Sequence, residues 1–112
     1  MIKRGEIYWV NLDPVVGSEI AKTRPALVVS NDVNNQFADT ITVLPITSNI
    51  SKIYPFEVFL PQNACGLKGD CKAKANQIRT VDKRRLGRLA GAVDSAVMDQ
   101  VEKAVKLHLV LS

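Results

Sequence analysis

The sequence contains few of the residues on which enzymes most often depend. Among 112 residues there are one histidine, His108, and two cysteines, Cys65 and Cys71. Two cysteines are too few for the disulfide framework of a small secreted domain, so we expect reduced thiols. A structural zinc ion needs about four ligands of these types, and no metal is expected. A single histidine also excludes acid–base catalysis by a histidine pair.

Membrane, export and cofactor signatures are lacking too. No apolar run approaches the roughly 20 residues that cross a bilayer, and the basic N-terminus, Met1–Gly5, lacks the apolar stretch of a secretory signal. There is no repeat, no internal linker, no nucleotide-binding glycine loop, no G-x-S-x-G elbow and no H-E-x-x-H pair. We therefore expect one cytoplasmic domain over residues 1–112, without a membrane partner or a cofactor.

Positive charge is concentrated in one segment. The formal net charge is +4, and residues 68–88 contain eight lysines and arginines against two aspartates. Such a segment is typical of a protein that binds a polyanion, but a solvated surface explains it equally well. The eight residues are Lys68, Lys72, Lys74, Arg79, Lys83, Arg84, Arg85 and Arg88.

Short segments rich in β-branched and aromatic residues predict a mainly β protein. Alternation in the first segment sets Ile7 and Trp9 on one face and Tyr8, Val10 and Leu12 on the other. For Trp9, packing in the core is favoured over stacking on a base. The expected strands are 6–12, 25–30, 40–46, 55–60, one within 72–81 that ends in 77–81 and, with a weaker pattern, 86–92.

Three of these strands carry more specific predictions. Residues 25–30 are apolar throughout, so we expect both of their faces to be covered. Pro45 cannot donate a hydrogen bond and predicts an edge strand or a bulge. In residues 55–60, Phe56, Val58 and Leu60 are expected to point inward, and 61–71 is expected to be loop.

The C-terminal segment predicts an amphipathic helix over 95–111. Asp94 is a suitable N-cap, and apolar residues recur behind it at helical spacing, with His108 near the same stripe. A packing role is therefore favoured for His108 over catalysis. Asn31 and Asp32 are expected to cap a short helical turn or form an Asx turn. Short strands followed by one helix predict a small curved or barrel-like sheet with a packed helix.

Arginine, lysine, carboxylates and hydroxyls remain for chemistry, and RNA is a substrate for which they suffice. The ribose 2′-OH attacks its own phosphate, so that positioning supplies much of the rate. A guanidinium stabilises the negative charge that gathers on the phosphate. Polar residues at strand ends and in the long loop after Asp13 are the candidates. They are Ser18, Glu19, Lys22, Arg24, Thr47, Ser48, Asn76, Gln77 and Arg79.

Taken together, several segments resemble the MazF/PemK/Kid family of toxins from bacterial toxin–antitoxin pairs. The resemblance implies a small SH3-like barrel of five to seven strands with a C-terminal helix, working as a homodimer. It also implies a metal-independent endoribonuclease that cuts single-stranded RNA, mainly mRNA, and leaves 2′,3′-cyclic phosphate and 5′-hydroxyl ends. The expected partner is an antitoxin with an acidic, flexible tail. The segments are 4–8, 12–19, 23–32, 45–48, 54–58 and 76–86.

The resemblance also assigns roles to residues. The catalytic arginine of the family falls on Arg24, its catalytic threonine on Thr47, and the glutamate of its Gly-Ser-Glu motif, considered for proton transfer in some members, on Glu19. Asn76 departs from members that have an acidic residue there, and an amide is not a base, although it can read a base edge. RNA-binding roles are expected for Ser18, Lys22, Ser48, Asn76, Gln77 and Arg79.

Two other functions remain open. A related SH3-like toxin that poisons DNA gyrase, or a barrel that binds nucleic acid without cutting it, would share the basic segment. The pairing of Arg24 with Thr47 favours the nuclease, because a binding poison does not need an arginine that activates a phosphate.

Overall fold

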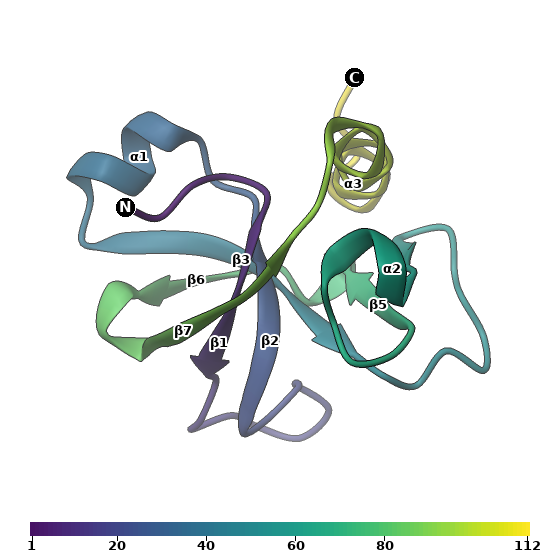
Figure 1. The fold of residues 1–112 in the computed structure, drawn as a ribbon, viewed down its shortest axis with the longest axis horizontal. Helices are drawn as coiled ribbons and strands as arrows, with labels where there is room; N and C mark the ends of the chain where they lie inside the picture. The colour runs from purple at the N-terminus through teal and green to yellow at the C-terminus, as the bar shows by residue number, and fades with distance from the viewer.

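The computed structural model describes all 112 residues as an antiparallel sheet of seven strands with a long helix at the C-terminal end (Figure 1). The β-rich fold class and the terminal helix are therefore confirmed. The strands are β1 (Glu6–Asn11), β2 (Thr23–Val28), β3 (Thr40–Thr47), β4 (Glu57–Leu60), β5 (Cys71–Lys74), β6 (Arg79–Asp82) and β7 (Leu86–Ala92). The helices are α1 (Asp32–Phe37), α2 (Gln62–Cys65) and α3 (Ser95–Leu109), and the 3-10 turns are η1 (Ala75–Gln77) and η2 (Lys83–Arg85).

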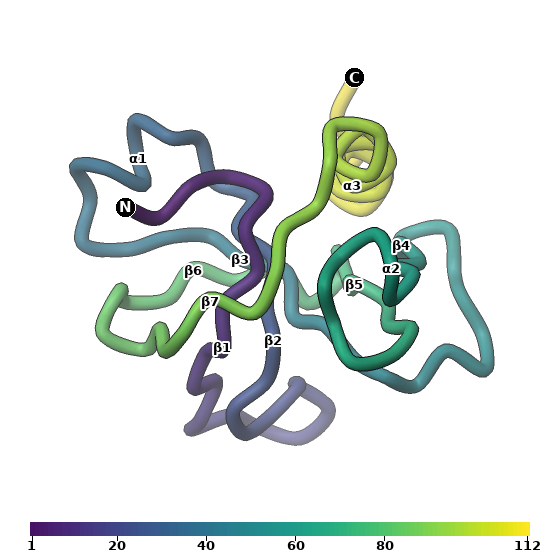
Figure 2. Tube along the Cα trace, viewed as in Figure 1, coloured from purple at the N-terminus to yellow at the C-terminus, as the bar shows by residue number.

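The sheet is open, which corrects the expectation of a barrel. Its strand order is β4-β5-β3-β2-β1-β7, and β6 pairs with β3 beside this path. The end strands β4 and β7 do not pair with each other. Strand β3 is central: one edge pairs with β2, and the other pairs first with β6 and then with β5. Figure 2 shows the loop between β1 and β2 projecting from one end of the sheet.

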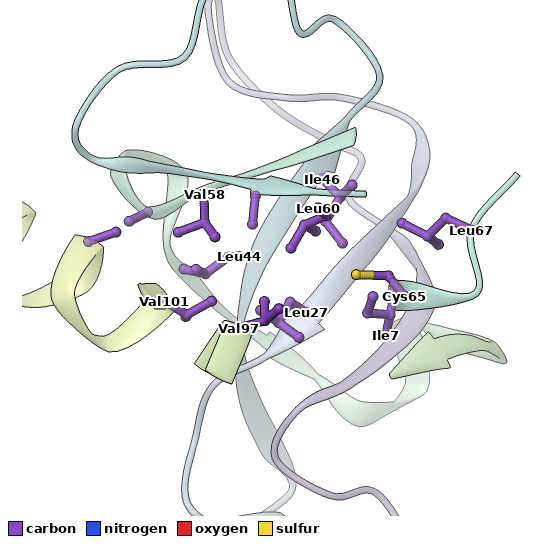
Figure 3. Packing of buried hydrophobic residues seen from close by; sticks show 13 residues of the cluster. Ile7, Leu27, Leu44, Ile46, Val58, Leu60, Cys65, Leu67, Val97 and Val101 are labelled. Atoms are coloured by element: carbon purple, nitrogen blue, oxygen red, sulfur yellow. The ribbon is translucent and has the colours of Figure 1, made fainter. Parts of the chain in front are cut away.

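Both faces of the central strands are buried, as the apolar run 25–30 predicts. Leu27 and Ile7 belong to a core that α3 covers, which we call the helix-side core (Figure 3). Val28 and Val10 belong to a second core on the other face. The predicted alternation of residues 6–12 is confirmed, because Ile7 lies in one core while Val10 and Leu12 lie in the other.

Both predicted helix starts are confirmed. The Asp94 side chain accepts from the Val97 amide at 2.9 Å, and α3 runs from there to Leu109. Asn31 caps α1 in the same way, accepting from the Asn34 amide at 2.8 Å. His108 is exposed, with its ring 6.5 Å from that of Phe56, so the expectation that it packs is met only by this surface contact. No helix has the length and apolar character needed to cross a membrane.

Several predicted boundaries are wrong. Strand β2 begins at Thr23 and ends at Val28, two residues earlier than expected at each end. Residues 72–81, which were expected to contain one strand ending in 77–81, contain parts of two, because η1 separates β5 from β6. Residues 61–71 include the helical turn α2 in place of a continuous loop. Strand β4 begins only at Glu57, so Phe56 lies before it and is half-buried.

Pro45 lies in a central strand, so the expected edge position is also wrong. It pairs with Ala26 of β2. On its other side it falls between the residues of β3 that pair with β6 and those that pair with β5. The missing N–H therefore lies where β3 changes partners, and no ladder of hydrogen bonds is broken there.

Candidate active site

The candidate site lies where β2 and β3 separate. Their pairing ends at Ala26 and Pro45. Beyond that point β2 continues against β1 as far as Thr23, while β3 continues against β5 as far as Thr47. Arg24 is two residues before Ala26, and Thr47 is two residues after Pro45. Both residues therefore lie past the end of the β2–β3 pairing, one on each arm of the fork, and they line different pockets.

Thr47 borders a small depression on its side of the fork. The Thr47 Oγ1 accepts from the Asn49 amide at 3.3 Å, which fixes the turn that follows β3. Thr47 is also the direct partner of Lys72 in β5, so their side chains are neighbours on one face. The depression has a volume of about 120 Å³ and is lined by Ile20, Thr47, Asn49, Lys72 and Lys74.

A second, more apolar pocket lies between the two arms of the fork, because both β2 and the end of β3 line it. Its volume is about 270 Å³, and its wall includes Trp9, Arg24, Pro25 and Ser48. Trp9 is half-buried and belongs to neither core, which differs from the expected packing role. The Arg88 guanidinium lies 6.0 Å from the centre of the Trp9 ring. Arg24 and Ser48, both predicted from the sequence, are therefore brought to one pocket.

The loop between β1 and β2 is held by hydrogen bonds at its base. The Lys22 amide donates to Asp13 Oδ1 at 2.9 Å, and the Leu12 amide donates to the Lys22 carbonyl oxygen at 2.9 Å. Lys22 adopts a φ of 69°, in the left-handed region that side chains disfavour. Within the loop, Glu19 Oε1 accepts from the Val16 amide at 2.8 Å. The Glu19 carboxylate therefore supports the turn.

Two predicted RNA-binding residues anchor this loop to the neighbouring strands. Gln77 Oε1 accepts from the Ile20 amide at 3.3 Å, and Arg79 Nη1 donates to the Leu12 carbonyl oxygen at 3.0 Å. Both contacts join the loop to η1 and β6, far along the chain. The sequence did not suggest this second use of the two side chains.

The other predicted residues do not converge. Ser18, Glu19 and Lys22 are exposed in the loop, and Asn76 is exposed in η1. No hydrogen bond or ion pair joins any of them to Arg24 or Thr47. The Arg24 guanidinium is itself largely unengaged, since its one hydrogen bond runs from Nε to the Ala21 carbonyl oxygen at 3.4 Å.

The sequence did not predict the buried ion cluster that lies beside Thr47. Lys72 Nζ lies 3.0 Å from Glu57 Oε1, and Lys74 Nζ lies 3.5 Å from Glu57 Oε2. Burial raises the pKa of Glu57, but the Tyr54 amide and the two ammonium groups outweigh it and hold that pKa below its usual value. The alternation in 55–60 placed Glu57 on the outer face. Two lysines spaced two apart, with alanines between and after, were the available signal.

Most of the basic segment is engaged within the protein. Besides the two lysines of the cluster, Arg84 pairs with Asp82, and Arg85 donates to the carbonyl oxygens of Asn11 and Asp13. With Arg79 on the loop and Arg88 over Trp9, six of the eight cations have a structural contact. Structural contacts therefore account for most of this segment, and whether it also binds a polyanion stays a prediction.

Comparison with known proteins identifies close relatives along almost the whole chain. Residues 3–109 match the family described as PemK-like, MazF-like toxin of type II toxin–antitoxin system. The endoribonuclease MazF9 of Mycobacterium tuberculosis is 51% identical over 114 residues, covering 97% of this chain and 97% of that protein. The endoribonuclease EndoA of Bacillus subtilis is 39% identical over 112 residues, covering 99% and 97%.

Solved structures share the fold. A crystal structure of MazF from Deinococcus radiodurans has a TM-score of 0.85 and 31% identity, covering 98% of this chain and 97% of that one. A MazE–MazF crystal structure from the same organism has a TM-score of 0.77 and 28% identity, covering 99% and 97%. The open seven-stranded sheet with its terminal helix is therefore an arrangement found in solved proteins.

Proposed function

The chain belongs to the family of PemK-like, MazF-like toxins of type II toxin–antitoxin systems, and we propose that it is a metal-independent endoribonuclease that cuts single-stranded RNA, mainly mRNA. The observation that carries this proposal is the 51% identity with an endoribonuclease across 97% of both chains. The fork between β2 and β3 is consistent with it, because the two arms carry Arg24 and Thr47. As a toxin, the enzyme stops translation and growth by cutting messages.

The proposed reaction uses the substrate's own hydroxyl. The 2′-oxygen attacks the adjacent phosphorus, its proton passes to a base, and the bond from phosphorus to the 5′-oxygen breaks. The leaving 5′-oxygen takes up a proton. The products are a 2′,3′-cyclic phosphate and a 5′-hydroxyl.

We assign three side chains to this reaction. Arg24 donates to the phosphate oxygens as negative charge builds up, and Thr47 supplies a hydroxyl donor on the other side of the fork. Glu19 is the carboxylate assigned to proton transfer, through the oxygen other than Oε1, which accepts from the Val16 amide. Asn76 cannot act as a base, and we assign it, with Ser18, Lys22, Ser48, Gln77 and Arg79, to RNA contacts.

The proposed partners follow from the relatives. A solved structure pairs MazF with MazE, and we propose that this chain likewise has an antitoxin, whose acidic flexible tail lies across the RNA site. We further propose a homodimer that acts in the cytoplasm. No small-molecule cofactor enters the proposed reaction.

The test is to incubate the purified protein with a long single-stranded RNA in the presence of EDTA and to map the cut sites. We expect cuts at one short sequence, with cyclic phosphate and 5′-hydroxyl ends. Cleavage that requires added Mg²⁺ would contradict the metal-independent mechanism. Inhibition of gyrase supercoiling by a protein that cuts no RNA would instead support the gyrase-poisoning alternative.

A further inference from the structure

The buried ion cluster beside Thr47 has more positive charge than its own contacts neutralise. Two ammonium groups, those of Lys72 and Lys74, share the one carboxylate of Glu57. The exposed fractions of these side chains are 1% for Glu57, 8% for Lys72 and 24% for Lys74. Buried ion pairs are costly to desolvate and seldom stabilise a fold more than apolar residues of the same size. The stability of the fold therefore does not explain the surplus charge.

The strand register places this cluster on the face that carries Thr47. Thr47 pairs directly with Lys72 across β3 and β5. Lys74 pairs directly with Glu57 across β5 and β4. Residues 72 and 74 are two apart in one strand, so they share a face. The depression that Thr47 borders is accordingly lined by both lysines.

Each lysine retains capacity for a ligand. Lys72 Nζ carries three N–H bonds and donates to two acceptors, Glu57 Oε1 at 3.0 Å and the Lys52 carbonyl oxygen at 2.7 Å. Lys74 Nζ is the more exposed of the two and lies at a longer 3.5 Å from Glu57 Oε2. The remaining lining, from Ile20 and Asn49, adds no negative charge. An anion is the ligand that this lining favours.

We propose that Lys72 and Lys74 form a phosphate subsite beside Thr47, which holds an RNA phosphate other than the one that is cut, and that Glu57 is a positioning residue for the two ammonium groups. This inference rests on the proposed ribonuclease function. The phosphate differs from the cleaved one because Arg24 and Lys72 lie on strands that flank opposite edges of β3. The RNA strand therefore crosses the end of β3, with Thr47 between two successive anchoring points.

The experiment uses the short RNA defined by cut-site mapping, with the attacking 2′-OH replaced by hydrogen so that binding is measured without cleavage. Each phosphate in turn is replaced by an uncharged methylphosphonate. For the wild-type protein we expect one position, away from the cut bond, at which the replacement weakens binding about tenfold. We expect the Lys74→Gln variant to bind the unmodified RNA about tenfold more weakly than the wild type does. A methylphosphonate at that same position should then weaken binding by the variant less than twofold.

Two further variants define the roles of the neighbours. Lys103→Gln removes one positive charge from the exposed surface of α3, and we expect its pattern of methylphosphonate effects to match that of the wild type. Affinity falls as salt rises, and Lys74→Gln should make the plot of log affinity against log salt less steep by about 0.7. This is the value for one contact to a single-stranded phosphate. In Glu57→Gln, the methylphosphonate at this position should weaken binding less than it does in the wild type. A general loss of stability would not act at one phosphate alone.

The outcomes separate this inference from the function on which it rests. A wild-type protein that cuts no RNA would overturn the proposed function. A protein that cuts RNA, but whose Lys74→Gln variant keeps the full penalty at every phosphate, would overturn the subsite and leave the ion cluster as an anchor for the β3–β4 segment. If Glu57→Gln does not fold, the comparison of the wild type with Lys74→Gln still decides whether the phosphate subsite exists.

Discussion

Arg24 has almost no part in holding the fold together. Its side chain is exposed, and its one hydrogen bond is the long contact from Nε to the Ala21 carbonyl oxygen. We therefore expect Arg24→Ala to fold like the wild type while losing about 100- to 1,000-fold in cleavage rate, the usual effect of removing one donor to a transition-state anion. Single-turnover cleavage of a defined RNA measures this, beside a urea unfolding curve.

Arg84→Ala is the matched control for that prediction. Arg84 is 91% exposed and pairs only with Asp82, so its removal takes away the same charge without touching the fork. We expect its rate to stay within about threefold of the wild type, as for most exposed ion pairs. An Arg24→Ala protein as active as Arg84→Ala would remove Arg24 from the mechanism.

The sequence identified some site residues and could not identify others, for a physical reason. Arg24 and Thr47 were assigned through resemblance, and the strand order places them on neighbouring strands although they are far apart in the chain. Glu57 was missed because alternation in one strand says which face a residue takes, not whether another strand covers it. Only the pairing of β4 with β5 buries this carboxylate and supplies Lys72 and Lys74 as its partners.

At the scale of elements, Gln77 anchors the loop between β1 and β2, which projects from one end of the sheet (Figure 2). The Ile20 amide donates to Gln77 Oε1 at 3.3 Å. We expect Gln77→Ala to leave this amide without a protein acceptor and to speed its hydrogen exchange about fivefold, which corresponds to one hydrogen bond of about 1 kcal/mol. Amide exchange followed by NMR at Ile20 measures it.

Asn76→Ala provides the control, because Asn76 is the exposed neighbour in the same 3-10 turn. Its replacement should leave the exchange of the Ile20 amide unchanged. Equal exchange in the wild type and Gln77→Ala would mean that the loop is held by its base contacts alone.

Strand β7 passes α2 so closely that only glycine fits at position 91. A Cβ built on Gly91 would lie 2.0 Å from the Cys65 carbonyl oxygen, a backbone atom that cannot turn aside. We expect Gly91→Ala to lower the free energy of unfolding by more than about 2 kcal/mol, because overpacked backbone must shift. Gly69→Ala has open space around it and should change the value by less than about 1 kcal/mol. Urea denaturation of both variants would show whether this difference exists.

Elements with a strong local signal were predictable, and those set by tertiary contacts were not. Residues 86–92 and the start of α3 at its Asp94 cap match the structure. The break between β5 and β6 was not predictable, because Ala75–Gln77 contains no glycine or proline to mark a turn. The closure of a barrel likewise depends on whether the end strands meet, and that is a property of the whole sheet.

For the whole molecule, the charge distribution limits what the basic segment can do. Most of its cations hold the loop, the ion cluster, Asp82 or Trp9. The net charge of +4 still attracts RNA over distance. The proposed site therefore assigns specific binding to the few cations with spare donors, such as Arg24 and Lys74, and less to the length of the basic run.

The same buried groups determine how the stability of the whole molecule depends on pH. The Tyr54 amide and two lysines hold the pKa of Glu57 below its ordinary value of 4.5 despite its burial, so the unfolded chain takes up a proton first as pH falls. Stability that this carboxylate contributes is present above pH 4.5 and is lost as pH falls through the lowered pKa. Asp82, whose pKa is lowered from 3.8 by Arg84, adds a loss of the same sign at lower pH.

The alkaline side is governed by groups with the opposite shift. Burial and the carboxylate of Glu6, which accepts from the Tyr8 hydroxyl at 2.9 Å, raise the pKa of Tyr8 from 10.0 to about 12. The stability that the protonated Tyr8 hydroxyl contributes is fully present below pH 10 and is lost as the pH rises to about 12. Burial also raises the pKa of Cys65 and Cys71 from 9.0, so the decline begins before tyrosine ionises.

We therefore expect the free energy of unfolding, measured in urea at a series of pH values, to be level between about pH 5 and 9 and to fall on both sides. Glu57→Gln should be less stable at pH 7, because Lys72 loses its charged partner, and its acid decline should be shallower. Tyr8→Phe should leave the acid decline intact and reduce the slope only above pH 10, where the thiol contribution remains. An acid decline as steep in Glu57→Gln as in the wild type would show that other carboxylates control acid unfolding, and that the pKa of Glu57 does not change on folding.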